Sequence, residues 1–334
     1  MKADNKSKID FVVLWVDDSD PVWREKKIKY VGEKNVKGNE DARYRDWDTL
    51  KYWFRGVEKF APWVNNVYFV TDNQKPDWLN INHPKLKWVK HTDFIPEQYL
   101  PTFNSNAIEL NVHRIDGLSE HFVYFNDDCF LIDKTEPEDF FIDGLPCEWP
   151  SIGPLIPIGF FAYTQMNNYQ VENRHFSMRD SIKNNYTKWF RNRSLKDLAK
   201  LLIYGSKNEI IGVDSWHIQI SFLKSTFNTV WAKEYETLDS TCKNKQRTKE
   251  DINCWCIKDW QILSGNFHPQ KPLGQLFHTV SLNNSNEAVE YLKKQKGKVV
   301  CLNDTENENN FEEHKRMIIE QFEKLFPEKS GFEL

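Results

Sequence analysis

Residues 100–132, LPTFNSNAIELNVHRIDGLSEHFVYFNDDCFLI, carry the most specific pattern in the chain. Within them, His121–Phe125 is a run of aromatic and β-branched side chains that is typical of a buried strand. The run breaks into Asn126, Asp127 and Asp128, whose polar groups are costly to bury without partners. Ligands bind beyond the carboxyl ends of strands in open α/β sheets, and Mg²⁺ or Mn²⁺ prefers oxygen ligands. The two acids therefore predict a metal site, with an ordinary turn as the alternative.

The first half of the same stretch predicts a helix that carries reactive groups. Ser105 is a suitable N-cap for a helix over 106–115. Glu109 and His113 are four residues apart on that helix, so they share a face, and Arg114 adjoins it. An acid, an imidazole and a guanidinium near a pair of acids supply a base, an orienting group and an anion clamp. The alternative is an ordinary surface ion pair.

Strands and helices alternate through the first part of the chain. Continuous apolar runs predict buried strands at 9–15, 66–71 and 86–89, and the period of 42–60 predicts a helix. Residues 22–42 are charged and contain two glycines, which favours a mobile flap. This order predicts a Rossmann-like α/β plan, although no GxGxxG motif indicates a dinucleotide site.

A second part begins after a stretch rich in proline and glycine. Residues 136–165 contain five prolines, and helical patterns follow at 177–190, 194–204, 217–228, 231–243 and 250–264. We therefore expect an α/β core over 1–140 and a helix-rich part over 141–334. Whether the two parts form one continuous catalytic domain stays open.

Composition excludes several classes of protein. A net charge of −4 argues against nucleic acid as a partner, and 48 aromatic residues suit stacking on sugars. A mean hydropathy of −0.68 with no long apolar run argues against a membrane span. The polar start lacks a signal-peptide pattern, so we expect a cytoplasmic protein whose six cysteines are reduced.

An ordered series of motifs gives the chain a family resemblance. The motifs are Phe60–Val64, Val70–Gln74, Leu100–Phe103, Ala107–Glu109, His113–Ile115, Gly117–Glu120 and Tyr124–Asp128. Their order resembles the second conserved block of the Stealth family of sugar-phosphate transferases, which includes bacterial capsular and exopolysaccharide enzymes and the lysosomal-enzyme GlcNAc-1-phosphotransferase. Residues 14–21 resemble the first block, with Leu14 and Asp18 in place of the usual Thr and Gly. Residues 212–261 resemble the third block and 299–304 the short fourth one.

The resemblance implies a fold and a reaction. The fold is a glycosyltransferase-A-like sheet core with a helix-rich C-terminal half. The resemblance implies that the core over 1–140 binds nucleotide sugar and metal, and that the part over 141–334 completes the active site. The reaction transfers a sugar-1-phosphate from a nucleotide-diphosphate sugar, which we expect to be a UDP-linked hexose or N-acetylhexosamine, to a hydroxyl of an acceptor glycan. It forms a phosphodiester in capsular or cell-surface polysaccharide and releases a nucleoside monophosphate.

The resemblance also implies roles for individual residues. Asp127 and Asp128 hold Mg²⁺ or Mn²⁺, and Arg247 acts on phosphate charge together with Arg45. Glu109 or His217 removes the acceptor proton, and the choice between these two stays open. The residues expected to touch the substrates are Asp17, Asp18, Arg45, Arg55, Asn104, His113 and Arg114.

Two other functions, the state of the acceptor glycan and a second location are kept as alternatives. A metal-dependent glycosyltransferase would share the pair of acids and release UDP, and a non-catalytic glycan-binding protein would need only the aromatic residues. The acceptor glycan is either free or lipid-linked. Peripheral association with the inner face of the cell membrane is an alternative to a purely cytoplasmic location.

Overall fold

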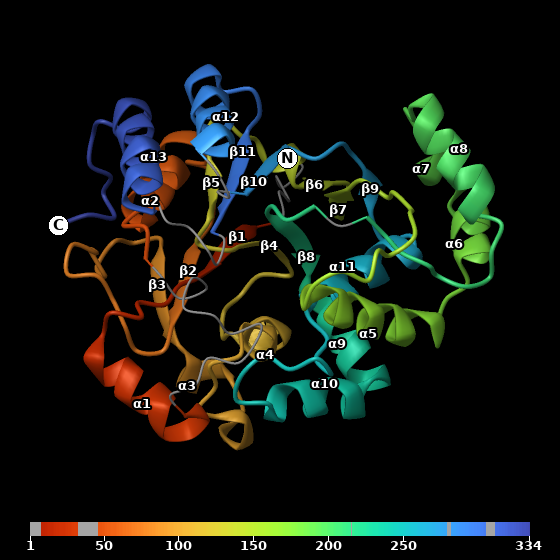
Figure 1. The fold of residues 1–334 in the computed structure, drawn as a ribbon, viewed down its shortest axis with the longest axis horizontal. Coiled ribbons are helices and arrows are strands. Elements are labelled where there is room, and N and C mark those ends of the chain that lie inside the picture. Colours follow the sequence, from red (N-terminus) through yellow and green to blue (C-terminus); the bar gives the residue numbers. More distant parts are fainter. Residues whose placement is uncertain (1–7, 33–45, 215, 279–281, 305–310) are drawn as a thin grey trace, which may run out of the picture.

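The computed structural model describes residues 8–32, 46–214, 216–278, 282–304 and 311–334, and its centre is a five-stranded sheet (Figure 1). The strand order is β3-β2-β1-β4-β8. The strands are β1 (Ile9–Leu14), β2 (Val67–Thr71), β3 (Leu86–Lys90), β4 (His121–Phe125) and β8 (Ile220–Leu223). The first four are parallel, and β8 runs antiparallel to β4. The predicted Rossmann-like α/β plan is confirmed.

Both faces of this sheet are buried, which explains the continuous apolar runs. Phe11 and Val13 of β1 face a core shared with α2 (Leu50–Phe60) and α13 (Phe311–Leu325). Val12 between them faces a second core. The helices of that second core are α4 (Ser105–Asn111), α9 (Lys224–Lys233), α10 (Tyr235–Lys243) and α11 (Cys254–Leu263).

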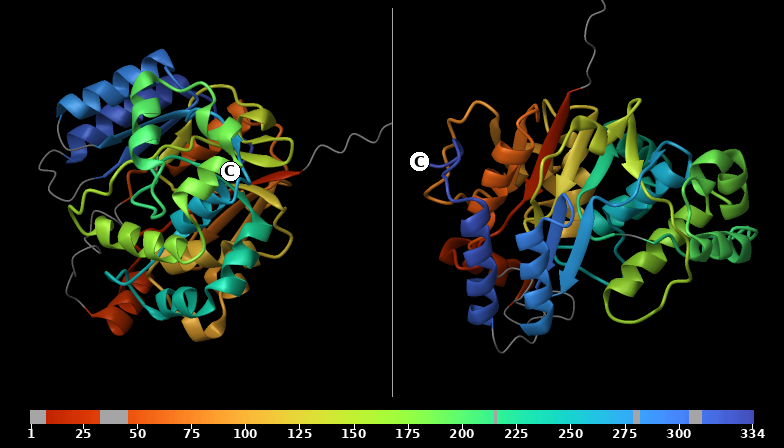
Figure 2. Two further views of the ribbon diagram at one scale, coloured as in Figure 1. Left: turned by 90° about the vertical axis from the view of Figure 1, so that its right-hand side faces the viewer. Right: turned by 90° about the horizontal axis from the view of Figure 1, so that it is seen from above.

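A second sheet lies next to the first and is built from distant parts of the chain. It has the order β10-β11-β5, where β5 is Cys129–Leu131, β10 is Gly274–His278 and β11 is Val299–Asn303. The helix α12 (Leu282–Lys294) connects β10 to β11 and lies beside α13 (Figure 2). The chain passes from β4 into β5 at Asn126–Asp128, so the pair of acids lies where the two sheets meet.

One segment of the helix-rich part projects from the body of the molecule as an arm (Figures 1 and 2). A small sheet of β6 (Phe141–Ile142), β7 (Leu145–Glu148) and β9 (His268–Pro269) lies at its base. The helix α5 (Phe161–Asn173) leads into the arm, whose own helices are α6 (Met178–Asn184), α7 (Tyr186–Phe190) and α8 (Leu195–Tyr204). A third cluster of buried side chains, which includes Trp189, Leu201 and Phe267, holds the arm together.

Several predicted elements differ from those observed. Part of the expected flap is the helix α1 (Pro21–Val31), with Asp20 as N-cap and Trp23 buried; residues 33–45 lie outside the described part of the chain. The helix expected over 42–60 begins only at Leu50. The helix expected over 217–228 is wrong in its first half, because Ile220–Leu223 pairs with the edge of β4 as a strand. A short helix α3 (His91–Phe94) precedes α4.

No helix in the described ranges is both long and apolar enough to cross a membrane.

Candidate active site

A cavity of about 540 Å³ lies beyond the carboxyl ends of β1 and β4. The strand order reverses between these two strands, because β1 is followed by β2 on one side and β4 lies on the other, and such a switch point is where α/β sheets bind ligands. The ends of β10 and β11 reach the same cavity through His278, Asn303 and Asp304. Its charged lining residues are Asp46, Asp72, Glu109, Asp127, Asp128, Arg247 and Asp304, together with His217. Its aromatic walls are formed by Trp15, Trp23, Trp47, Phe103, Phe160, Phe161 and Trp255.

The two acids after β4 have different surroundings. Asp128 Oδ2 lies 3.8 Å from His217 Nε2, and the side chain of Asp128 is 24% exposed. Burial alone would raise the pKa of Asp128, but its interaction with His217 holds that pKa below the ordinary value. Burial raises the pKa of Asp127 to about 8, and the negative charges of Asp128 and Asp46 act in the same direction.

The crowding of these carboxylates suits a divalent cation. Burial is also the largest cause that raises the pKa of Asp46, to about 6. All three acids line the cavity, and the negative charges of Asp128 and Asp46 together disfavour ionisation of Asp127. Oxygen donors in this arrangement are those that Mg²⁺ or Mn²⁺ takes, so the residues fit the predicted metal.

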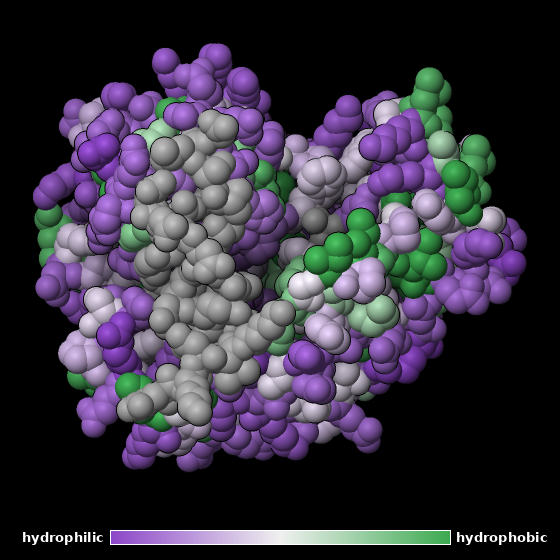
Figure 3. All heavy atoms as spheres, in the orientation of Figure 1, coloured by the Kyte–Doolittle hydropathy of each residue, from purple (hydrophilic) through white to green (hydrophobic). Residues whose placement is uncertain are grey.

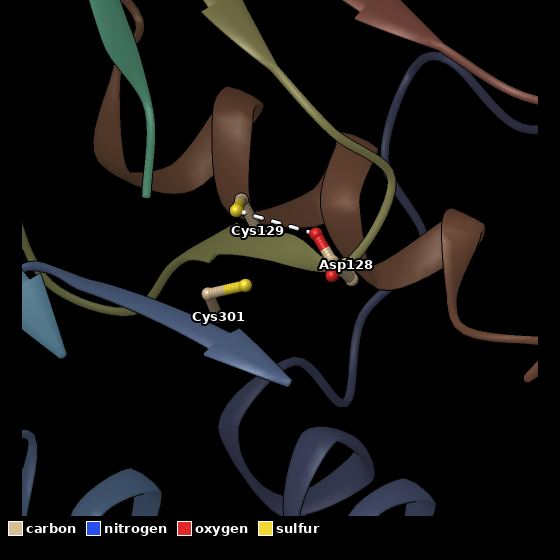
Figure 4. A group of neighbouring side chains, drawn as sticks. All are labelled: Asp128, Cys129 and Cys301. Carbon is tan, nitrogen blue, oxygen red and sulfur yellow. Dashed lines mark hydrogen bonds between the residues drawn. The ribbon is translucent and has the colours of Figure 1, made fainter. Parts of the chain in front are cut away.

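A neighbouring group of Asp128, Cys129 and Cys301 does not suit a metal of this kind (Figure 4). Cys129 Sγ donates to Asp128 Oδ1 at 3.4 Å, and Cys301 faces it from the partner strand β11. Burial raises the pKa of the Cys129 thiol to about 12 and that of Cys301 well above its ordinary value, so both stay protonated. Since a hard cation prefers oxygen to a neutral thiol, the role of Cys129 here is to orient Asp128.

Glu109 reaches the cavity from the middle of α4. It is 8% exposed, and the Tyr124 hydroxyl lies 3.4 Å from its Oε1. Its Oε2 is buried and has no hydrogen-bond partner among the described residues. Burial raises the pKa of Glu109, whereas Cys254, Arg247 and His217 act to lower it. Glu109 therefore combines a raised pKa with a buried carboxylate oxygen that lacks a hydrogen-bond partner among the described residues.

Arg247 is held over the start of α4. Its Nε and Nη2 donate to Ser105 Oγ at 3.1 and 2.5 Å. The loop that carries Arg247 is fixed by Asp251, which is fully buried and accepts from Asn104, Asn106, Asn244 and Thr248. The helix α11 that follows is capped by Asn253 and not by Asp251. Asp251 instead joins two distant segments that together position the guanidinium.

His113 and Arg114 do not share the cavity face with Glu109. The chain tightens into a 3₁₀ turn at Val112–Arg114 after α4 ends, so the expected spacing of one helical turn is lost. His113 stacks on Phe227 with ring centroids 5.2 Å apart, and burial lowers its pKa to about 3. Arg114 lies over the ring of Trp231, 4.6 Å from its centroid. Neither residue lines the cavity, so we assign both to packing.

Arg55 and Asn104 are also placed away from the cavity. Arg55 donates from Nε and Nη2 to the two carboxylate oxygens of Glu333, each at 2.7 Å, and from Nη1 to the carbonyl oxygen of Phe326. Asn104 is fully buried, accepts from the backbone N–H of Asn106 and is the N-cap of α4 in place of the predicted Ser105. Both side chains are hydrogen-bonded within the protein, and neither lines the cavity.

The two acids of the loop after β1, Asp17 and Asp18, do not line the cavity. Val16 lines the cavity, whereas Asp17 Oδ1 accepts from the N–H and hydroxyl of Ser19, and Asp18 lies 3.8 Å from Arg24. Gln74 bonds the backbone of Asp17 from the end of β2 and so fixes the loop. Arg45 lies outside the described residues.

Three acids that line the cavity, Asp46, Asp72 and Asp304, were not predicted as site residues. Asp46 was included in a predicted helix, although it lies in the irregular segment before α2. Asp304 accepts from Trp47 Nε1 at 3.1 Å and follows the apolar run of β11, as Asp127 follows β4. An acid directly after a buried strand was therefore the signal that could have identified Asp304.

Comparison with known families gives three matches along the chain. The family model described as Stealth protein CR2, conserved region 2, matches residues 43–146. That for conserved region 1 matches residues 7–35, and that for conserved region 4 matches residues 290–334. The matched regions include the loop after β1, the pair of acids after β4 and the strand β11.

Curated relatives are similar over almost the whole chain. A capsular polysaccharide phosphotransferase, WcwK of Streptococcus pneumoniae, is 42% identical over 98% of this chain and 99% of its own length. A receptor polysaccharide phosphotransferase, WefC of Streptococcus gordonii, is 44% identical with the same coverage. The exopolysaccharide phosphotransferase cps2G of Lactiplantibacillus plantarum is 36% identical over 97% of this chain and 96% of its own.

Similarity to solved structures is weaker. The galactosyltransferase LgtC in complex with donor and acceptor sugar analogs has a TM-score of 0.41 and 10% identity, over 94% of this chain and 95% of that one. We draw no conclusion about the reaction from a likeness of this size.

Proposed function

Because the chain belongs to the Stealth family, we propose that it transfers a sugar-1-phosphate from a nucleotide-diphosphate sugar to a hydroxyl of an acceptor glycan. The donor is a UDP-linked hexose or N-acetylhexosamine, and the acceptor glycan is free or lipid-linked. A bond forms between the acceptor oxygen and the sugar-side phosphorus, and the bond from that phosphorus to the oxygen bridging the two phosphates breaks. The nucleoside monophosphate leaves with the bonding electrons, and the bond to the anomeric carbon is untouched.

One observation carries this proposal. The cavity at the switch point of the sheet combines paired carboxylates, a guanidinium and a buried carboxylate with an unbonded oxygen, supplied by residues 100–132 and by the distant Arg247. Transfer of a phosphoryl group asks little covalent chemistry of a protein and depends on positioning, cationic charge and a base. Those three requirements correspond to the groups that line this cavity.

The paired acids serve the phosphate end of the donor. Asp127 and Asp128 would hold Mg²⁺ or Mn²⁺, whose chemistry when bound is to neutralise negative charge on phosphoryl oxygens. His217 and Cys129 orient the Asp128 carboxylate from two sides. Asp46 adds negative charge to the same wall.

Arg247 provides positive charge toward the transferred phosphoryl oxygens. Its guanidinium is held by Ser105 and the segment fixed by Asp251, so little reorganisation is needed when charge develops. We keep Arg45 in the proposal as a second phosphate contact. The loop at Asp17 and Asp18 is proposed to contact the nucleotide through its backbone.

Glu109 is the proposed general base. Its buried Oε2 accepts the proton of the attacking hydroxyl, and the raised pKa makes it a stronger base than an ordinary carboxylate. His217 Nε2 lies 3.4 Å from Asn126 Nδ2 and 3.8 Å from Asp128, so this nitrogen already faces protein groups. This difference favours Glu109 over His217.

For the location we propose the cytoplasm, with peripheral association at the inner face of the cell membrane. All six cysteines are free thiols, which suits a reducing compartment.

The reaction is tested by the phosphorus-containing products. Candidate nucleotide sugars are incubated with acceptor glycan and Mg²⁺, and the mixture is followed by phosphorus NMR and nucleotide chromatography. We expect a new phosphodiester signal and an equal amount of nucleoside monophosphate, both absent in EDTA. A glycosyltransferase would release nucleoside diphosphate without a phosphodiester, and a glycan-binding protein would leave the donor intact; either result contradicts the proposal.

A further inference from the structure

The outer surface of the arm exposes several large apolar side chains. Tyr186 of α7 is 61% exposed, and Leu195, Leu202 and Ile203 of α8 are 86%, 72% and 60% exposed. Leu195, Ala199 and Leu202 recur at intervals of four and three residues, so they form one stripe along α8, with Ile203 beside it. Green side chains gather on this arm at the upper right of Figure 3.

The exposed stripe is not the side of α8 that packs inside the arm. The inner sides of the same helices are already packed, since Ile182, Trp189 and Leu201 are buried with Leu263 and Phe267. Lys188 also ties α7 to the body by donating to the carbonyl oxygen of Gly265 at 2.6 Å. The arm is therefore folded and attached, and its apolar outer surface is available to something outside the chain.

The arm differs from the rest of the protein in charge. Residues 178–207 contain eight Lys and Arg against two Asp, whereas the remaining residues contain 37 basic and 47 acidic side chains. Several of these cations are exposed on the arm, including Lys183, Arg191, Lys196 and Lys207. Apolar side chains among exposed cations are the features of helices that lie at an anionic lipid surface.

We propose that the arm formed by α7 and α8 docks the protein on an anionic lipid bilayer, with Leu195, Leu202 and Ile203 inserted among the headgroups. A helix of ten residues is about 15 Å long, about half the thickness of the hydrocarbon region, so α8 lies in the interface and does not span it. A second copy of the chain is a poorer occupant, because it would bring an equally cationic arm against the first.

This docking would keep the cavity near the membrane surface. The segment between β7 and α5 exposes Ile156 and Ile158 at 68% and 79% and continues into Phe160 and Phe161, which line the cavity. Figure 3 shows apolar side chains both on the arm and beside the central hollow of the same face. The inference does not depend on the reaction proposed above, because it rests on the outer surface of the arm alone.

Vesicle flotation tests the docking without any measurement of turnover. The wild-type chain should float with phosphatidylcholine vesicles that contain phosphatidylglycerol, should not float with phosphatidylcholine alone, and should dissociate as salt is raised. Changing Leu195, Leu202 and Ile203 together to Ser should weaken binding at least about tenfold. The same loss is expected when Lys183, Lys196 and Lys207 are changed to Glu.

A control separates docking from a general loss of surface hydrophobicity. Ile81→Ser with Tyr235→Ser removes exposed apolar side chains elsewhere and should bind vesicles as the wild type does. All variants should keep the wild-type melting temperature, since the altered groups are exposed. Failure of the wild type to float, or equal binding by the triple Ser variant, overturns the proposal. So does a dimer in light scattering that only the triple Ser variant loses, because the arm would then be a protein interface.

Discussion

Asp127 links the electrostatics of the cavity to the stability of the fold. Its pKa of about 8 means that the folded, metal-free protein holds a proton that the unfolded chain releases near the ordinary value of 3.8. The resulting contribution to stability is fully present below about pH 4 and is lost as the pH rises through about 8. The acids of the cavity therefore destabilise the metal-free protein at neutral and higher pH.

Asp127→Asn should show this effect in thermal melts. In EDTA at pH 8 the variant should melt at a higher temperature than the wild type, because one of three repelling carboxylates is gone. Adding Mg²⁺ or Mn²⁺ should stabilise the wild type and not the variant. Asp143→Asn is the control, since Asp143 is exposed and its positive φ of 53° is tolerated by Asn. Equal stabilisation of Asp127→Asn by metal would rule out Asp127 as a ligand.

A pH profile and two variants distinguish Glu109 from His217 as the general base. Glu109→Gln keeps the shape of the side chain and should lower kcat by about 10²–10⁴-fold while donor binding stays near normal. The wild-type rate should rise with pH as Glu109 ionises, at a pH above the ordinary Glu value because burial raises its pKa. Tyr124→Phe, which removes only the hydroxyl near Oε1, should have a smaller effect. Wild-type kcat in Glu109→Gln together with loss of activity in His217→Ala would make His217 the base.

The sequence was sufficient to predict that several residues meet in one site. It was not sufficient to predict which side chains lie next to one another there. Asp127, Asp128 and Glu109 could be grouped because strand ends and a short helix meet at one edge of a sheet. His113 was predicted to lie beside Glu109 because regular helix geometry was assumed, and the 3₁₀ turn at Val112–Arg114 changes its direction. Arg55 pairs with Glu333, 278 residues away, and no local pattern encodes such a contact.

At the scale of elements, α2 is tied to the end of the chain by Arg55. The side chains of Arg55 and Glu333 are only 12% and 4% exposed, so loss of one partner leaves a charge buried. Arg55→Ala should therefore lower the free energy of unfolding by about 3–5 kcal/mol and leave the kcat of the folded enzyme unchanged. Chemical denaturation and steady-state kinetics measure the two quantities.

Lys59→Ala is the matched control for Arg55→Ala. Lys59 lies on the same helix and donates to the carbonyl oxygen of Leu325, but its side chain is exposed. Its loss should lower the free energy of unfolding by less than about 1 kcal/mol. A stable Arg55→Ala variant with a raised KM for the donor would restore the substrate role that the sequence suggested.

Buried strands were predicted better than edge strands. The runs at Ile9–Leu14 and His121–Phe125 are apolar on both faces, and the predicted bounds differ from the observed ones by at most one residue. The strand β8 was read as helix because its four residues are followed directly by α9, and only pairing with β4 distinguishes the two. A short edge strand takes its conformation from its neighbour, which a single sequence does not show.

For the whole molecule, the family resemblance and the transferase class predicted from the sequence are confirmed by relatives that are 36–44% identical over almost all of the chain. The two halves contribute jointly to the sheets, since β8 extends the first one and β10 and β11 pair with β5 in the second. Groups from both halves therefore meet in one cavity, with Glu109 and Asp128 from the first and His217 and Arg247 from the second.

The central claim concerns which bond of the donor breaks. Phosphoryl transfer and glycosyl transfer would use the same cavity, the same cation and the same donor, but only phosphoryl transfer moves the sugar-side phosphate. The most direct measurement follows a donor labelled with ³²P in that phosphate. We predict that the label passes to the acceptor glycan, with retention of the anomeric configuration and release of unlabelled nucleoside monophosphate. Label that stays with a released nucleoside diphosphate would contradict the account.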